Sequence, residues 1–170
     1  MKVVAVVQAR MGSIRFSNKV MRKIVNVPMI GLLLKRLSKS RLLNQIILAT
    51  SIDDKDQPLV DYVESLGFDC MRGSINDVLD RYNQVVLKNK ADIIVRITGD
   101  CPLVDSDLVD KCINNFINLN VDYFSNTNPP TFPDGLDIEV IKSTALKKAA
   151  KEAKDPYDRE HVTPYIQKEY

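Results

Sequence analysis

Short apolar runs alternate with helix-like segments through the first two thirds of the chain, and this alternation restricts the fold more than any other feature. Four runs have the length and composition of buried strands: Val3 to Val7, Gln45 to Thr50, Phe68 to Met71 and Asp92 to Ile97. Helical spacing of apolar residues follows them, over residues 28–39, 56–66, the segment after Asn76 and 105–118. The pattern predicts a parallel sheet with right-handed crossovers.

The pattern becomes less regular after residue 120. We expect a short strand over residues 122–124, a loop to residue 136, a strand over 136–141, a helix over 143–153 and a last helix over 158–168. No linker-like stretch precedes this part. We therefore interpret it as an added layer of one domain, residues 1–170.

The composition excludes several classes of function. The 170 residues carry 24 basic and 22 acidic side chains and a net charge of +2, which gives no indication of a nucleic-acid or membrane partner. No apolar run reaches the length of a transmembrane helix or a signal peptide. Cys70, Cys101 and Cys112 are widely spaced and odd in number, which predicts free thiols and a cytoplasmic protein.

A basic segment, Gln8 to Lys19, follows the first predicted strand. It contains Arg10, Arg15 and Lys19 and no carboxylate, and we expect Gly12 to turn the backbone where a Cβ would clash. Backbone N–H groups and guanidinium forks in such a turn bind phosphate oxygens. The segment matches neither a Walker A loop nor a dinucleotide fingerprint. We predict a triphosphate site here; a basic surface loop is the alternative.

A second loop, Thr98 to Leu103, follows the fourth predicted strand and presents Asp100. Ligands of open α/β sheets bind at the carboxyl ends of the strands, where both loops belong. Mg²⁺ commonly takes one or two protein carboxylates and fills its other positions with water and phosphate oxygens. Asp100 is therefore a candidate Mg²⁺ ligand; a turn residue bonded to its own backbone is the alternative.

Five motifs occur in one order along the chain. They are Gln8 to Ser13 (QARMGS), Asp77 to Tyr82 (DVLDRY), Arg96 to Leu103 (RITGDCPL), Asp134 to Val140 (DGLDIEV) and Arg159 to Tyr165 (REHVTPY). Together they closely resemble the cytidylyltransferases of the spore-coat polysaccharide type. These are relatives of the acylneuraminate and 3-deoxy-manno-octulosonate cytidylyltransferases.

The resemblance implies an α/β fold: a three-layer α/β/α sandwich with a mostly parallel sheet, the nucleotide-diphospho-sugar transferase (GT-A-like) fold. It implies transfer of CMP from CTP to a hydroxyl of a sugar, expected to be an acidic one, with release of pyrophosphate. Mg²⁺ is the implied cofactor, surface polysaccharide synthesis the implied process, and a homodimer the implied assembly.

The resemblance also implies roles for individual residues. Those on the triphosphate would be Arg10, Ser13, Arg15 and Lys19, and Asp100 would bind Mg²⁺. Ala9 and Met11, with the backbone of the loop at Gly12, would lie near the cytosine, and Asp77 and Arg81 would line the pocket. Asp137 and Glu139 would face the acceptor or the metal. Asn126 is a further candidate for binding the acceptor, with a Pro-rich turn as the alternative.

The chain departs from the family pattern in two places. Residues 14–19 read Ile-Arg-Phe-Ser-Asn-Lys where the family usually has Thr-Arg-Leu-Pro-Gly-Lys. The sequence also stops at Tyr170, before the late acidic stretch that supplies a second metal carboxylate in relatives. We therefore expect a chain that lacks the C-terminal part of the fold.

Other functions remain open from sequence. A nucleotidyltransferase for another base or acceptor and a catalytically incomplete nucleotide-binding domain are the two alternatives. His161, the only histidine, has a structural role in our interpretation, with a catalytic base as the alternative.

Overall fold

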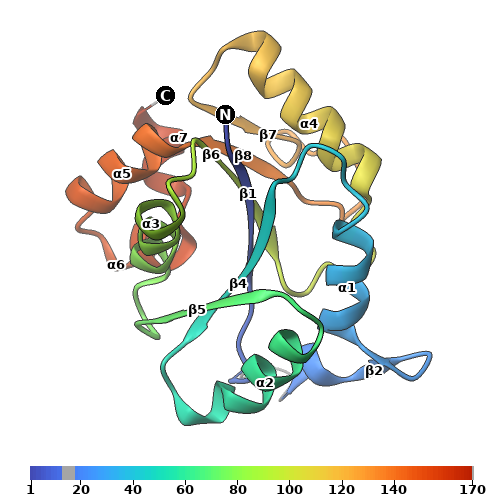
Figure 1. The fold of residues 1–170 in the computed structure, drawn as a ribbon. Coiled ribbons are helices and arrows are strands. Elements are labelled where there is room, and N and C mark those ends of the chain that lie inside the picture. Colours follow the sequence, from blue (N-terminus) through green and yellow to red (C-terminus); the bar gives the residue numbers. More distant parts are fainter. Residues whose placement is uncertain (13–17, 170) are drawn as a thin grey trace.

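The computed structural model describes residues 1–12 and 18–169, and these residues form a central six-stranded sheet with the order β5-β4-β1-β6-β8-β7 (Figure 1). Its parallel strands are β1 (Val3–Gln8), β4 (Gln45–Ser51), β5 (Asp69–Gly73) and β6 (Ile93–Thr98). The antiparallel part consists of β7 (Tyr123–Ser125) and β8 (Glu139–Lys142), with β8 pairing β6. The four expected parallel strands are therefore confirmed.

Helices cover both faces of this sheet (Figure 1). On one face lie α1 (Met29–Leu37), α2 (Gln57–Ser65) and α4 (Ser106–Leu119). On the other face lie α3 (Val78–Asn89), α5 (Ser143–Glu152), α6 (Pro156–His161) and α7 (Pro164–Glu169). The arrangement is the expected three-layer α/β/α sandwich.

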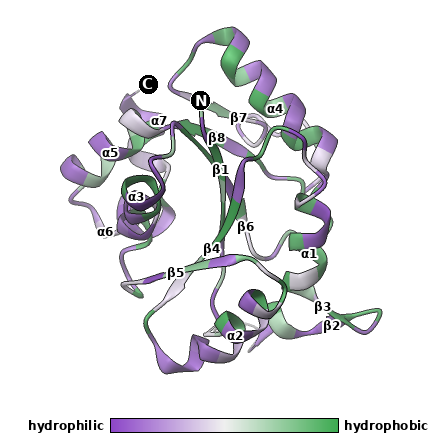
Figure 2. Cartoon of the chain, viewed as in Figure 1, coloured by the Kyte–Doolittle hydropathy of each residue, from purple (hydrophilic) through white to green (hydrophobic). Residues whose placement is uncertain are grey.

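Alternation along β1 explains why the sheet has two buried faces. Val3, Ala5 and Val7 belong to the core under α1, α2 and α4, whereas Val4 and Val6 belong to the core under α3, α5 and α7. Successive side chains of a strand point to opposite faces, so an all-apolar run can be buried on both sides. Apolar residues accordingly concentrate along the strands and the inner sides of the helices (Figure 2).

The segment after the basic loop forms a short hairpin. A 3₁₀ turn, η1 (Lys19–Met21), precedes β2 (Lys23–Ile24) and β3 (Val27–Pro28), which pair antiparallel. The turn between these strands is at Val25 and Asn26, both with positive φ. The sequence Asn26-Val27-Pro28 predicts a turn over residues 26–28, but the turn lies at residues 25–26 and Val27 already belongs to β3.

Three boundaries also differ from prediction. The expected helix over residues 158–168 is two helices, because Val162 has a φ of 73° and ends α6. Strand β8 begins at Glu139, three residues after the predicted start. The sequence favours Asn76 as the N-cap of α3, but Asp77 caps this helix: its carboxylate accepts from the Asp80 N–H at 2.9 Å.

Within the described ranges, every helix is too short or too polar to cross a bilayer. Cys70, Cys101 and Cys112 are free thiols, as the sequence predicted.

Candidate active site

The loops that follow β1 and β6 lie against each other at the carboxyl edge of the sheet. The Gly99 N–H donates to the Gln8 carbonyl at 2.8 Å. A Cβ at position 99 would lie 2.6 Å from the Ala9 Cβ and 2.8 Å from the Gln8 carbonyl oxygen. Gly99 therefore allows the two loops to meet, which brings the basic segment and Asp100 to one place.

Lys19 and Asp100 form an ion pair across this junction. The Lys19 Nζ lies 3.0 Å from the Asp100 Oδ2, and the two side chains are 33% and 52% exposed. Partial burial alone would raise the pKa of Asp100, but hydrogen bonds from Lys19 and Thr98 outweigh it and hold that pKa below its ordinary value. The predicted convergence of the basic segment on Asp100 is confirmed for Lys19, while Ser13 and Arg15 lie outside the described residues.

A cavity of about 430 Å³, here called the first cavity, opens beside this pair on the α3 and α6 face. It is lined by Gln8, Ala9, Arg10, Lys19, Val20, Ile75, Val78, Arg81, Arg96, Thr98, Gly99, Asp100, Glu160 and His161. Four predicted site residues besides Asp100 thus gather around one space: Ala9, Arg10, Lys19 and Arg81. The cavity combines cationic groups with an apolar wall at Ile75 and Val78, a combination that suits a nucleotide.

Three buried polar atoms among the described residues have no hydrogen-bond partner: the Gln8 Oε1, the Arg81 Nε and the Arg96 Nε. All three residues line the first cavity. Buried polar atoms are normally satisfied, so each exception needs an explanation. These three atoms are inaccessible in the structure, so the missing partners are not supplied from the open space of the cavity.

Asp56 anchors the basic segment, a role that sequence reasoning missed. This carboxylate is 2% exposed and accepts from the Met11 N–H at 2.6 Å and the Thr50 hydroxyl at 2.9 Å. It also accepts from the Ser51 N–H and hydroxyl. The bond to Met11 fixes the loop after β1 to the end of β4.

Met11 and Gly12 belong to the loop that was expected to lie near the cytosine. Met11 packs against the core under α1, α2 and α4 and is not among the residues of the first cavity. No atom of the described residues lies within 4 Å of a Cβ built at Gly12, whose φ is not positive. The described residues therefore show no steric need for glycine at position 12.

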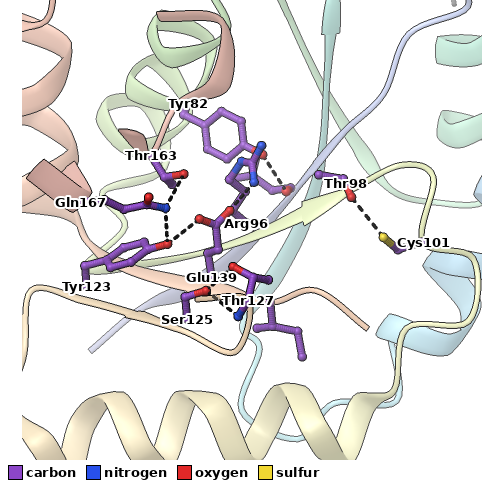
Figure 3. Close-up of polar contacts among 12 residues, drawn as sticks. Tyr82, Arg96, Thr98, Cys101, Tyr123, Ser125, Thr127, Glu139, Thr163 and Gln167 are labelled. Carbon is purple, nitrogen blue, oxygen red and sulfur yellow. Dashed lines mark hydrogen bonds and ion pairs between the residues drawn. The ribbon is translucent and has the colours of Figure 1, made fainter. Parts of the chain in front are cut away.

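A buried polar network joins Arg96, which lines the first cavity, to residues of β7, β8 and α7 (Figure 3). Arg96 is ion-paired with Glu139, its cross-strand neighbour on β8, and Glu139 also accepts from the Tyr123 hydroxyl at 2.6 Å. Gln167 of α7 donates to the same hydroxyl at 2.9 Å. Both oxygens of Glu139 are thus bonded within the protein, and this residue positions Arg96 at the cavity wall.

The amide of Asn126 is likewise bonded within its own loop. It donates to the Leu136 carbonyl at 2.8 Å and accepts from the Ile138 N–H at 2.8 Å. Asn126 is 6% exposed and is absent from the lining of both cavities described here. The arrangement matches the Pro-rich turn that was the alternative interpretation of this residue.

Asp77 connects α3 to the REHVTPY motif. Besides capping α3, its carboxylate pairs with the Arg159 guanidinium at 2.7 Å. This contact brings α6 to the first cavity, where Glu160 and His161 form part of the wall. His161 also contacts the Tyr157 ring, with centroids 4.3 Å apart. The sequence shows the REHVTPY motif, but only the fold shows that its Arg159 pairs with Asp77.

A second cavity, about 880 Å³, lies on the other side of Asp100 and shares Thr98 and Asp100 with the first. Asp137 and Phe132 belong to its lining. Burial and the neighbouring carboxylates of Asp134, Glu139 and Asp100 raise the pKa of Asp137. Asp137 and Asp100 therefore border one space, and a group bound in either cavity can approach Asp100.

The residues at this junction fit a divalent cation that is shared with a ligand. Asp100 is a carboxylate whose pKa lies below its ordinary value, and it lies where the two cavities meet. Among the described residues, no group of three or more His, Cys, Asp or Glu side chains could hold a metal by itself. Such a site matches Mg²⁺, which is commonly held by one or two carboxylates together with substrate phosphates.

The sequence of this chain is similar to those of several known proteins. The chain is 45% identical over 166 residues to "Uncharacterized protein MJ1063" of Methanocaldococcus jannaschii, covering 98% of this chain and 67% of that protein. It is 32% identical over 169 residues to the spore coat polysaccharide biosynthesis protein SpsF of Bacillus subtilis, covering 96% of this chain and 69% of that protein. The 3-deoxy-manno-octulosonate cytidylyltransferase of Geobacter metallireducens is 30% identical over 66% of this chain, which spans only 44% of that enzyme.

A solved structure of a cytidylyltransferase from Leptospira borgpetersenii has a TM-score of 0.94 and 34% sequence identity, and the match covers 99% of this chain and 71% of that one. The family model described as Cytidylyltransferase matches residues 4–170. This chain therefore belongs to the cytidylyltransferase family of nucleotidyltransferase enzymes.

Proposed function

We propose that the protein transfers CMP from CTP to a sugar hydroxyl and releases pyrophosphate, in the synthesis of a surface glycan. The observation that carries the proposal is the Lys19–Asp100 pair, 3.0 Å apart, at the junction of two cavities. A transferase of this kind needs one space for the nucleotide and another for the acceptor, with the transferred phosphorus between them. The names of the relatives, SpsF and the 3-deoxy-manno-octulosonate cytidylyltransferases, support this assignment.

In the proposed complex, CTP occupies the first cavity. Arg10 and Lys19 contact the triphosphate, where a guanidinium fork and an ammonium group are both effective partners of phosphate oxygens. Ile75 and Val78 provide an apolar wall for the nucleoside. We assign no role to Ser13 and Arg15 beyond the expectation that they help to bind the triphosphate.

The proposed reaction is an in-line displacement. The acceptor hydroxyl oxygen forms a bond to the α-phosphorus, the bond from that phosphorus to the bridging oxygen of pyrophosphate breaks, and the hydroxyl proton is released to water. The protein contributes by positioning the two reactants and by stabilising charge on the phosphate oxygens with Lys19 and Arg10. Mg²⁺, held by Asp100 when bound, would neutralise phosphate charge.

The free thiols support a cytoplasmic place of action, where CTP is available. A homodimer remains part of the proposal on the basis of the family resemblance.

The test measures pyrophosphate release from CTP and Mg²⁺ with a panel of sugars. We expect release by the wild-type chain and a loss of at least a hundredfold in Lys19→Ala and Asp100→Asn, with Lys147→Ala as the matched control on the exposed side of α5. Binding of CTP without release for any sugar would indicate a nucleotide-binding domain without transfer activity. A preference for UTP, GTP or ATP would instead indicate another base specificity.

A further inference from the structure

Met11 holds together the two ends of the basic segment that the structure describes. Its carbonyl accepts from the Asn18 N–H at 3.2 Å, so the segment that starts after Arg10 closes directly before Lys19. The Met11 side chain packs against the core under α1, α2 and α4. The position of Met11 therefore affects both Arg10 and Lys19, the two described cations that the proposed function assigns to the triphosphate.

A buried carboxylate fixes the backbone of Met11. The Met11 N–H donates to the Asp56 Oδ1 at 2.6 Å, although the two residues are 45 positions apart in the sequence. The other carboxylate oxygen, Oδ2, accepts from the Thr50 hydroxyl at 2.9 Å, from the Ser51 N–H at 3.1 Å and from the Ser51 hydroxyl. Asp56 thus uses one oxygen for the loop after β1 and the other for the end of β4, the neighbouring strand (Figure 1).

The segment that carries Asp56 is in turn held by Arg72 of β5. The Arg72 Nε donates to the Ser51 carbonyl at 3.0 Å, and its Nη2 donates to the Asp53 carbonyl at 2.9 Å. The Asp56 N–H donates to the same Asp53 carbonyl at 2.9 Å. A side chain that is locked by its own hydrogen bonds can hold other groups in one geometry. The bond from Met11 to Asp56 therefore restricts the basic segment to one position.

The negative charge of Asp56 would by itself oppose the binding of a triphosphate. Arg81 lines the first cavity; burial is the main cause that lowers its pKa, and the carboxylate of Asp56 is among the groups that oppose this change. Asp56 is thus electrostatically coupled to the wall of this cavity. Like charges repel, so removal of this charge alone would strengthen the binding of an anion. A weaker binding after its removal would have to come from geometry.

We propose that Asp56 is a positioning residue for the nucleotide: through the Met11 N–H it fixes the basic segment so that Arg10 and Lys19 reach the phosphates in the first cavity. This inference rests on the proposed function and adds to it a residue that lines neither cavity. A loop that is already held in its binding geometry loses less conformational entropy when the ligand binds. The bond also directs the Met11 N–H to Asp56, so the two side-chain cations, and not this N–H, contact the phosphates.

The test compares the affinities of wild type and Asp56→Ala for CTP and CMP in the presence of Mg²⁺, by calorimetric titration. The variant loses the bond to Met11 together with one negative charge. Electrostatics alone would increase its affinity for CTP, whereas loss of positioning decreases it. We expect CTP to bind at least about tenfold more weakly to the variant. The loss should be smaller for CMP, which has only one phosphate for Arg10 and Lys19.

Thr50→Val is the matched control. It removes a hydrogen bond to the Asp56 Oδ2 in the same buried cluster and leaves the bond between the Oδ1 and the Met11 N–H in place. Urea denaturation measures the stability of each variant. We expect Thr50→Val to be less stable than wild type because it loses a buried hydrogen bond, and to bind CTP within about twofold of wild type.

Asp56→Asn is a second variant, which has nearly the size of the native residue. It has one acceptor oxygen in place of two, so it cannot bond the Met11 N–H and the Ser51 N–H together. We expect it to bind CTP more weakly than wild type, and it decides the test if Asp56→Ala does not fold.

Unchanged or tighter binding of CTP by the folded Asp56 variants would overturn the inference. So would an equal loss of affinity for CMP, or a loss in Thr50→Val as large as that in Asp56→Ala, which would indicate general destabilisation. Failure of the proposed function has a different signature: the wild-type chain binds CTP but releases no pyrophosphate with any sugar, and the comparison of the variants still decides the inference. A wild-type chain that does not bind CTP would overturn both.

Discussion

Asn18 has a left-handed backbone, with a φ of 56°, directly before the turn that carries Lys19. The Asn18 N–H donates to the Met11 carbonyl at 3.2 Å, so this conformation also closes the basic loop. The cytidylyltransferases that this sequence resembles usually have glycine at this position. Asn is among the residues that best tolerate the left-handed region. Asn18 therefore suits the left-handed backbone that the structure shows at position 18.

Asn18→Val should therefore destabilise the protein, whereas Asn18→Gly should be close to neutral. A β-branched residue in the left-handed region costs about 1–2 kcal/mol. Urea denaturation of the two variants would measure the difference. Equal stabilities would show that the backbone at this position does not depend on the side chain.

Gly99→Ala should lower both stability and nucleotide binding. The new Cβ would lie 2.6 Å from the Ala9 Cβ, so the loops after β1 and β6 would have to separate. Overpacking of this kind costs about 1–3 kcal/mol. Gly12→Ala is the control, because a Cβ there meets no described atom within 4 Å. If both variants unfold at the same urea concentration as the wild type, the close approach of the two loops at Gly99 does not restrict the side chain at this position.

The Lys19–Asp100 pair should contribute a pH-dependent part of the stability. The pKa of Asp100 is lower in the folded protein than its ordinary value of 3.8, so its contribution is present above that value and disappears as the pH falls through the folded pKa. The difference in unfolding free energy between wild type and Asp100→Asn should be constant from about pH 6 to 8 and change below about pH 4. A difference that stays constant down to pH 2 would contradict the pairing.

At the scale of elements, the Arg96–Glu139 pair joins the parallel and antiparallel parts of the sheet (Figure 3). The two side chains are 15% and 6% exposed. Removing one member of a buried pair leaves the other charge uncompensated and typically costs about 3–5 kcal/mol. Glu139→Ala should therefore destabilise strongly, and Tyr123→Phe, which removes one hydrogen bond to a charged group, by about 1.5–3 kcal/mol. Thermal unfolding would measure both, and a Glu139→Ala variant as stable as Tyr123→Phe would contradict this account.

Strong local patterns made the elements of the first two thirds predictable. The run from Val3 to Val7 is apolar without interruption, and this pattern is typical of a strand that is buried on both faces. The end of α6 was not predictable, because Val162 adopts a positive φ that its side chain disfavours and tertiary packing imposes. The antiparallel direction of β8 depends on its pairing with β6, a contact between distant segments.

The residues of the candidate site also differ in whether the sequence could predict them. Lys19 and Asp100 were candidates from sequence because the basic segment and the loop that carry them each follow a predicted strand. Asp56 was not, because its partner is the backbone N–H of Met11, 45 residues away, and no side-chain pattern records that bond. Glu139 was expected to face the acceptor, but the residue that binds it, Arg96, becomes evident only from the register of β6 and β8.

At the scale of the whole molecule, the sandwich has two cavities, and the carboxylate of Asp100 lines both of them. The first cavity opens on the α3 and α6 face, and the second lies beside α4. The central claim is that the nucleotide binds at the Lys19–Asp100 junction. CTP with Mg²⁺ at 100 times its Kd should raise the unfolding free energy by about 2.7 kcal/mol through mass action.

The most direct test is calorimetric titration of CTP and Mg²⁺ into the wild-type chain, Lys19→Ala, Asp100→Asn and the control Lys147→Ala. Lys19 and Asp100 are the two groups that meet between the cavities. We predict binding by wild type and Lys147→Ala, and at least tenfold weaker binding by the other two variants. Equal affinity in all four proteins would place the nucleotide elsewhere and contradict the account.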